Sequence, residues 1–220
     1  MQPKYNFGKG IRIGYLSAQS VSVFCHQHTG WTAFGNISSN YSSEFNIEAI
    51  VHNAFDKVAI ENDQVFVEFP EGHDKKPEAY FFNVSTWDGS LSVKDSRKAE
   101  LQGLIKKYDL DILIMNGDSD PKVCNIKFLT DSRNKSAIIL SKRYFSVIKA
   151  DSLEYLGMNM GTGGASANGH YPSNIENLTK DEIESLEEII KADIYNGIRD
   201  LFKAVGLGEA DYVESQIAPL

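Results

Sequence analysis

A glycine-rich polar stretch, residues 157–172, is the part of the chain whose composition points most directly to chemistry. It holds five of the chain's 17 glycines. Glycine lets a backbone approach a ligand closely, and consecutive N–H groups in such a loop can form a nest for an anion. We predict that this loop binds a phosphate-like group. The binding residues would be Gly161, Thr162, Gly163, Gly164, Ser166 and Asn168. The alternative is a surface loop or lid without a ligand.

Two further side chains of this stretch could act on a substrate. His170 is the candidate general acid or base. Ser166 is a candidate nucleophile, which would make the protein a serine hydrolase with His170 as its base. The surrounding Gly-Ala-Ser-Ala-Asn sequence lacks the second glycine of a nucleophile elbow, so the hydrolase stays a third interpretation.

Two aspartates follow a continuous apolar run at residues 112–115. Ligands of open α/β sheets bind beyond the carboxyl ends of the strands, so Asp118 and Asp120 are candidate catalytic residues. They could share a divalent cation or divide acid and base roles, because neighbouring carboxylates shift each other's pKa. The alternative is a turn that leads into a helix, with Pro121 in the first helical position.

His26 and His28 form a third candidate site, since two histidines one residue apart on a strand can both bind a transition metal. They could instead contact substrate or be structural. Their spacing does not require a metal, and the sequence establishes no cofactor. A divalent metal would suit these residues.

Strands are expected to position most of these residues in the first half of the chain. Residues 11–16, 21–25 and 46–52 are rich in residues that suit a pleated sheet, and residues 64–84 resemble a hairpin with a long polar tip. A helix beginning near Ser96 precedes the strand at 112–115, which is the half-unit of a parallel α/β sheet.

The second half is expected to continue this pattern. Residues 122–129 suggest a short helix, residues 136–140 a strand, and residues 145–148 either its hairpin partner or the next parallel strand. A long amphipathic helix then begins at Thr179, which forms a capping box with Glu182, and ends at Gly206.

Composition and charge restrict the class of protein. The chain of 220 residues is 42% hydrophobic, 11% aromatic and 24% charged, which is typical of a folded protein. It has no apolar run long enough to cross a bilayer. Its net charge of −8 disfavours nucleic acid as a partner, although seven of those charges lie in residues 176–220. Two widely spaced cysteines favour a reducing, cytoplasmic location.

The sequence therefore predicts one α/β domain over residues 1–220. Its mixed sheet would be β-rich in the N-terminal half, contain parallel β/α units in the second half, and carry a long C-terminal helix. We predict an enzyme, a transferase or hydrolase, that recognises a small anionic ligand, namely a nucleotide or nucleotide sugar. The main alternative is a non-catalytic protein that sequesters a ligand or docks a partner on the acidic helix.

Overall fold

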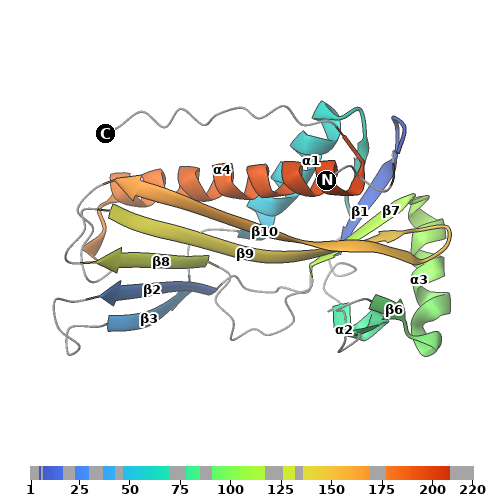
Figure 1. The fold of residues 1–220 in the computed structure, drawn as a ribbon, viewed down its shortest axis with the longest axis horizontal. Coiled ribbons are helices and arrows are strands. Elements are labelled where there is room, and N and C mark those ends of the chain that lie inside the picture. Colours follow the sequence, from blue (N-terminus) through green and yellow to red (C-terminus); the bar gives the residue numbers. More distant parts are fainter. Residues whose placement is uncertain are drawn as a thin grey trace.

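A long antiparallel ribbon forms the spine of the computed structural model (Figure 1). It consists of β9 (Ser136–Lys149) and β10 (Glu154–Asn168), which pair along almost their whole lengths. The structure describes residues 5, 7–16, 23–29, 37–42, 47–69, 78–84, 91–116, 126–131, 136–168 and 177–208. Strands and helices are assembled on the two sides of this ribbon.

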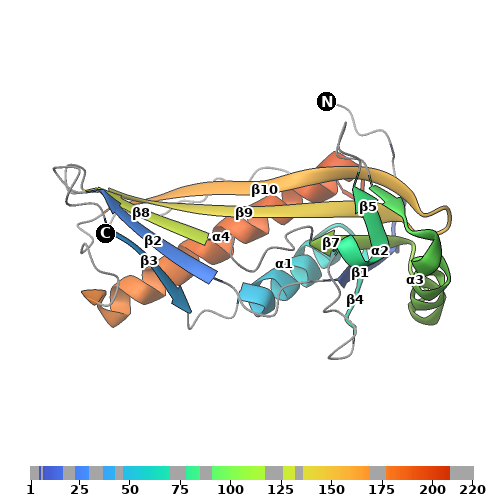
Figure 2. The ribbon, with the colours of Figure 1, turned by 90° about the horizontal axis from the view of Figure 1, so that it is seen from below.

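The edge of β9 that does not pair with β10 pairs with two groups of strands, which follow each other along β9. Its first part pairs antiparallel with β8 (Ile126–Asp131), which is followed by β2 (Val23–Thr29) and β3 (Ile37–Ser42). Its last part pairs antiparallel with β7 (Ile112–Asn116), followed by β1 (Arg12–Leu16) and β4 (Val65–Val67). We call these the β2 group and the β1 group. Figures 1 and 2 show them at opposite ends of the ribbon.

The pairing is parallel throughout the β1 group and in part of the β2 group. β1 is parallel to both β4 and β7, and β2 is parallel to β8. The whole forms one eight-stranded mixed sheet, and β5 (Phe82–Val84) pairs with β6 (Leu91–Val93) in a separate two-stranded sheet. The predicted mixed α/β class is thus confirmed. The assignment of residues 1–220 to one domain stays a prediction.

Helices cover both faces of the β1 group. α1 (Ile47–Glu61) and α4 (Lys180–Val205) pack on one face, and α3 (Asp95–Tyr108) packs on the other, beside the four-residue α2 (Glu78–Phe81). Alternate residues of β7 enter different cores: Ile112 and Ile114 contact the first, Leu113 and Met115 the second. This strand is apolar throughout because both of its faces are buried.

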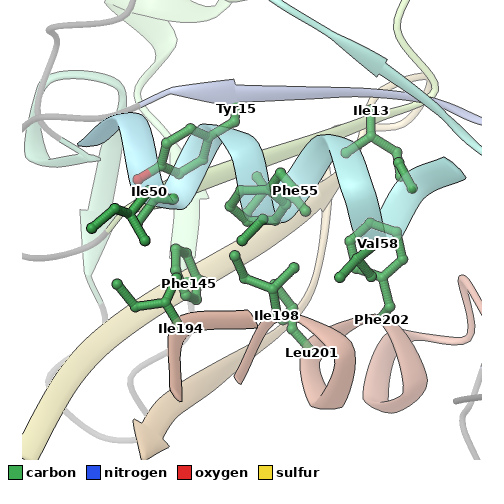
Figure 3. Close-up of a cluster of buried hydrophobic side chains, with 14 of the residues drawn as sticks. Ile13, Tyr15, Ile50, Phe55, Val58, Phe145, Ile194, Ile198, Leu201 and Phe202 are labelled. Carbon is green, nitrogen blue, oxygen red and sulfur yellow. The ribbon is translucent and has the colours of Figure 1, made fainter. Parts of the chain in front are cut away.

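The α1–α4 core is centred on aromatic rings (Figure 3). The ring of Phe55 lies 4.8 Å from Tyr15, 5.5 Å from Phe145 and 6.4 Å from Phe202, measured between centroids. These side chains come from α1, β1, β9 and α4, so Phe55 joins four elements that are far apart in sequence.

The α3 core is smaller and is packed closely around Gly14. A Cβ atom at Gly14 would lie 2.7 Å from both Leu110 Cδ1 and Phe69 Cζ. Glycine is therefore required here because two side chains occupy the space that any other residue would need. Leu101 of α3 is fully buried in the same core.

Hydrogen bonds from one buried glutamine tie the two ends of the described chain together. The side-chain amide of Gln64 donates to the carbonyl oxygens of Gly8, at 3.0 Å, and Leu207, at 2.9 Å. Its own carbonyl accepts from the N–H of Ile11 at 2.8 Å. The amide nitrogen thus donates two hydrogen bonds and the amide oxygen accepts one, as a buried polar side chain requires.

Helix α4 agrees closely with its sequence signals. The hydroxyl of Thr179 accepts from the N–H of Glu182, and the Glu182 carboxylate accepts from the N–H of Thr179, which completes the predicted capping box. The helix ends at Gly206, whose φ of 80° is left-handed. Its apolar residues Leu186, Ile190, Ile194, Ile198, Leu201 and Val205 are buried, whereas Ile183 is exposed.

Several predicted elements differ from the structure, first among them residues 46–52. These lie in α1 from Ile47 onward, because Ile50, Val51, Ala54, Phe55 and Val58 bury one helical face. The prediction of a β-rich first half is wrong to that extent. The hairpin predicted for residues 64–84 is also wrong, since β4 pairs with β1 and β5 pairs with β6.

The second half contains more antiparallel pairing than predicted. Residues 136–140 and 145–148 belong to one strand, β9, which is antiparallel to β7, β8 and β10. Residues 126–129 are in strand β8 and not in a helix. Parallel pairing of the second half is described for β7 with β1 and for β8 with β2. Helix α3, which precedes β7, begins at Asp95 without a side-chain cap.

Candidate functional site

Residues 157–168 of the glycine-rich stretch lie in strand β10, which removes the basis of the predicted anion cradle. Gly161, Gly163 and Gly164 are paired with Arg143, Ser141 and Leu140 of β9. Successive N–H groups of a strand point in opposite directions, whereas an anion nest needs neighbouring N–H groups that converge. The Gly-rich loop predicted here is therefore wrong.

The other predicted binding residues of this stretch occupy the same strand. Thr162, Ser166 and Asn168 are paired with Lys142, Ile138 and Ser136. Their side chains, and the whole of His170, lie outside the described residues. A strand also differs from the sharp strand-to-helix turn that presents a nucleophilic serine.

One glycine of β10 has a structural explanation. Gly157 lies at the β-bulge near the start of the strand and has a φ of 148°, a backbone conformation that other residues rarely adopt. Helix α4 packs against β10 more extensively than against β9.

The two candidate aspartates follow β7, where the sequence places them, but Asp118 and Asp120 lie outside the described residues. β7 and β1 run parallel, and Met115 is paired with Leu16. The chain therefore leaves β7 beside the carboxyl end of β1. Strand β4 lies on the other side of β1. In open α/β sheets, ligands bind in a crevice beyond the carboxyl ends of such parallel strands.

Described titratable residues near this edge come from β1 and α1. Tyr15 is fully buried near the end of β1, and its ring lies 5.3 Å from that of His52. Glu48 is one turn before His52 on α1. Among residues with described side chains, no group of three His, Cys, Asp or Glu could hold a metal ion. A divalent metal stays a prediction.

His26 and His28 occupy alternate positions of β2, so the expected strand is present. They are paired with Ser39 and Ile37 of β3, and with Phe128 and Thr130 of β8. The structure describes the backbone of these two histidines but not their side chains.

A groove lies between α1 and α4. It has a volume of about 370 Å³. Its lining combines small apolar side chains with charged and aromatic ones: Ile50, Asn53, Ala54, Lys57, Glu188, Lys191, Ala192 and Tyr195. Most of the lining surface is apolar, and the charged groups lie on both helices.

Tyr195 is the centre of the polar contacts beside the groove. Its hydroxyl donates to the carboxylate of Glu61. The Lys57 ammonium lies 4.5 Å from its ring centroid, and the Arg199 guanidinium lies 5.6 Å from it. Burial, together with the hydrogen bond to Glu61, raises the pKa of Tyr195 to about 12. The phenol is therefore neutral, and its ring attracts cations.

The two lysines of the groove differ in their partners. Lys191 lies 2.8 Å from a Glu188 carboxylate oxygen and 3.0 Å from one of Glu187, and these hydrogen bonds raise its pKa. Lys57 forms no ion pair with any residue that the structure describes. Its cation–π contact leaves the ammonium able to bind an anion.

Sequence reasoning missed this groove because it placed residues 46–52 in a strand. The groove needs two helices side by side, and its residues on α1 and α4 are more than 130 positions apart. The spacing of Ile50, Ala54 and Lys57 on one helical face was the signal that could have indicated it.

No family model matches the chain, and no curated protein matches it in sequence. Several solved structures show a distant likeness. A PelC dodecamer from Paraburkholderia phytofirmans has a TM-score of 0.36 at 8% identity, over 90% of this chain and 93% of that one. Protein XCC0632 from Xanthomonas campestris, of the DUF330 family model, has a TM-score of 0.35 at 5% identity, over 92% and 86%.

Lipoprotein GNA1162 from Neisseria meningitidis is a third such structure, with a TM-score of 0.31 at 12% identity, over 84% of this chain and 99% of that chain. All three scores are below 0.5, and no residue role is carried over from them. No helix in the described ranges is long and apolar enough to cross a membrane. A cytoplasmic location stays a prediction from the cysteines.

The predicted nucleotide- or nucleotide-sugar-directed transferase or hydrolase is wrong. Within this chain the predicted phosphate loop is strand β10. The serine hydrolase interpretation depended on the same loop, so it is wrong for the same reason. The alternative, a non-catalytic binding or interaction protein, does not depend on that loop.

Proposed function

We propose that the protein is a non-catalytic interaction protein that docks a short, acidic, amphipathic segment of a partner in the α1–α4 groove. The observation that carries the proposal is an apolar groove beside a lysine that has no ion pair in the described part of the chain. This proposal retains the predicted anionic ligand, with a carboxylate in place of a phosphate.

The floor of the groove suits an inserted apolar side chain. Ala54 and Ala192 face the groove from the two helices, and Ile50 contributes a larger apolar surface beside them. Two small residues leave room that a leucine or isoleucine would otherwise fill. Amphipathic helices commonly bind in this way, with apolar anchors three or four positions apart inserted between two helices.

The rim of the groove suits a carboxylate. Lys57 is held above the Tyr195 ring on the α1 side, while Lys191 on the α4 side is already bound by Glu187 and Glu188. A glutamate of the partner would pair with Lys57 as its apolar neighbours cover the alanines. A lysine of the partner would meet an unpaired cation there. The groove therefore favours an acidic segment over a basic one.

Synthetic peptides test this preference. Two helical peptides of about 16 residues, roughly 24 Å long, would share the same apolar positions and carry either glutamates or lysines on the polar face. Fluorescence anisotropy should show the glutamate peptide binding at least about tenfold more tightly, or roughly 1.4 kcal/mol. Equal binding of the two peptides would contradict the proposal.

Matched variants locate the binding site. Lys57→Glu should weaken the glutamate peptide about tenfold or more, and Ala192→Phe should block it by filling the groove. Lys98→Glu, at an exposed lysine on α3, makes the same charge change away from the groove and should leave binding unchanged. If Lys57→Glu and Lys98→Glu have the same effect, the peptide responds only to net charge and the groove is not its site.

A further inference from the structure

Strand β10 lies at a boundary of the large sheet. It pairs with β9 on one edge, and no other described strand pairs with it. Backbone groups of an antiparallel strand point alternately to its two sides. About half of the N–H and C=O groups of this 15-residue strand therefore point away from β9. Each of these groups can bond to water or to another extended chain.

The sequence of β10 lacks the features that usually protect an edge strand from pairing. Such strands are typically short, or carry lysine, proline or a bulge. β10 has a bulge near Tyr155 and Gly157 and a charge at Glu154, both at its beginning. The following stretch, residues 158–168, contains no charged residue and no proline. The other edge strands are much shorter: β4 has three residues and β3 has six.

Helix α4 runs along the ribbon and packs against β10 (Figure 2). Its backbone groups are hydrogen-bonded within the helix, so it cannot complete the ladder of a strand. Water can satisfy the outer edge of β10 in a single copy. A partner that replaces this water and extends the ladder must be another extended chain, and it must be long and uncharged over about ten residues to match residues 158–168.

We propose that the outer edge of β10 pairs antiparallel with β10 of a second copy of this chain. The second copy satisfies both requirements, since its strand has the same length and the same uncharged stretch. With a twofold axis through the uncharged stretch, no like charges face each other there, and the two Glu154 residues lie at opposite ends of the paired strands. The sheet then continues through both copies.

This arrangement makes a prediction about ionic strength. The twofold axis is perpendicular to the sheet, so both α4 helices lie on the same face near the new interface. Each α4 carries seven acidic and four basic residues. The two helices repel each other, and salt screens this repulsion. Association should therefore be stronger at about 0.5 M salt than at about 0.05 M.

Sedimentation of the full chain between about 1 and 200 µM is the first test, and the range spans typical weak to moderate affinities. We expect a monomer–dimer equilibrium that shifts toward dimer with added salt. In the same samples, amide hydrogen exchange in residues 158–168 should slow by about tenfold or more between the dilute and the concentrated state. A monomer at every concentration, with unchanged exchange, would overturn the proposal.

A cysteine scan tests the antiparallel register. Single substitutions Met160→Cys, Thr162→Cys, Ala165→Cys and Ala167→Cys would be made with Cys25 and Cys124 replaced by serine. Only positions at the twofold axis bring their sulfurs within disulfide reach, so cross-linking should peak at one position and fall on both sides. Val65→Cys on edge strand β4 is the control. Equal cross-linking at all positions, or none above the control, would contradict the pairing.

Charged variants distinguish pairing of β10 from association elsewhere. Ala165→Lys and Ser166→Lys occupy adjacent positions, which project from opposite faces of a strand, so one of them adds a lysine on the face away from α4. That variant should retain its circular dichroism spectrum and lose dimer by about tenfold or more. Full retention of dimer by both folded variants would exclude this edge. Peptide binding in the groove should be unaffected, so the two proposals fail separately.

Discussion

The two cores on opposite faces of the β1 group share strands but differ in how they are built. The α1–α4 core draws Phe55 from α1, Phe145 from β9 and Phe202 from α4, and Phe7 packs against it from the N-terminal segment. The α3 core uses residues from Phe69 to Met115 together with Leu16 and Ile148. The first core thus joins distant parts of the chain, whereas the second is mostly local.

This difference predicts different unfolding behaviour. Damage to the α1–α4 core should release several elements at once, because α1, α4, β1 and β9 all contribute buried side chains to it. Damage to the α3 core should first release α3 and the small β5–β6 sheet, which border the ribbon. The following variants test this comparison.

Phe55→Ala should have the largest effect. It removes a fully buried ring that contacts Tyr15, Phe145 and Phe202. We expect a loss of about 4 kcal/mol in the free energy of unfolding, measured by urea denaturation. Ile60→Ala on the same helix is the control, because Ile60 is 66% exposed and should change stability little.

Leu101→Ala should cost less, about 3 kcal/mol. Leu101 is fully buried in the α3 core. Hydrogen exchange should accelerate in α3 before it does in α1, which would show local opening. A larger loss for Leu101→Ala than for Phe55→Ala, or simultaneous exchange in both helices, would reverse the comparison.

Thr179→Ala should cost about 1 kcal/mol, because it removes the hydroxyl that caps α4. The α4 helix belongs to the α1–α4 core, so the loss should appear as a lower urea midpoint for the whole protein. Lys180→Ala at the next, exposed position is the control. A loss confined to fraying of the first helical turn would show that this end of α4 is uncoupled from the core.

Tyr195→Phe should have the smallest effect at neutral pH and a distinct effect in alkali. The pKa of Tyr195 is raised to about 12, so the folded state keeps a proton that the unfolded state loses near pH 10. The stabilising contribution is thus complete below pH 10 and is lost as pH rises toward 12. The difference in tyrosinate absorbance between wild type and Tyr195→Phe should titrate near pH 12. Titration near pH 10 would show that the contact with Glu61 does not persist in solution.

The elements predicted correctly are those whose signals are local. The Thr179 capping box spans four residues, and Gly206 ends α4 at a residue that tolerates positive φ. Strand β7 was recognisable as a continuous apolar run because both of its faces are buried. Such patterns act within one or two turns or one strand, so they can be read without knowledge of the fold.

The incorrect predictions involve elements that depend on distant partners. The β-branched residues around Ile50 suit a strand, and only packing against Tyr15 and α4 decides for a helix. The glycines of β10 suit a loop, and only pairing with β9 and packing by α4 hold them in a strand. The candidate site followed the same error, since a groove between two helices cannot be predicted when one of them is assigned to a sheet.

The sequence by itself determined the mixed α/β class, the long capped C-terminal helix and the apolar strand before Asn116. The tertiary structure alone decided that residues 157–168 of the glycine-rich stretch lie in a strand and that Lys57 lies over the ring of Tyr195. The physical reason is distance along the chain. Helix caps and apolar periodicity act between neighbours, whereas sheet pairing and grooves depend on contacts between segments that only the folded chain brings together.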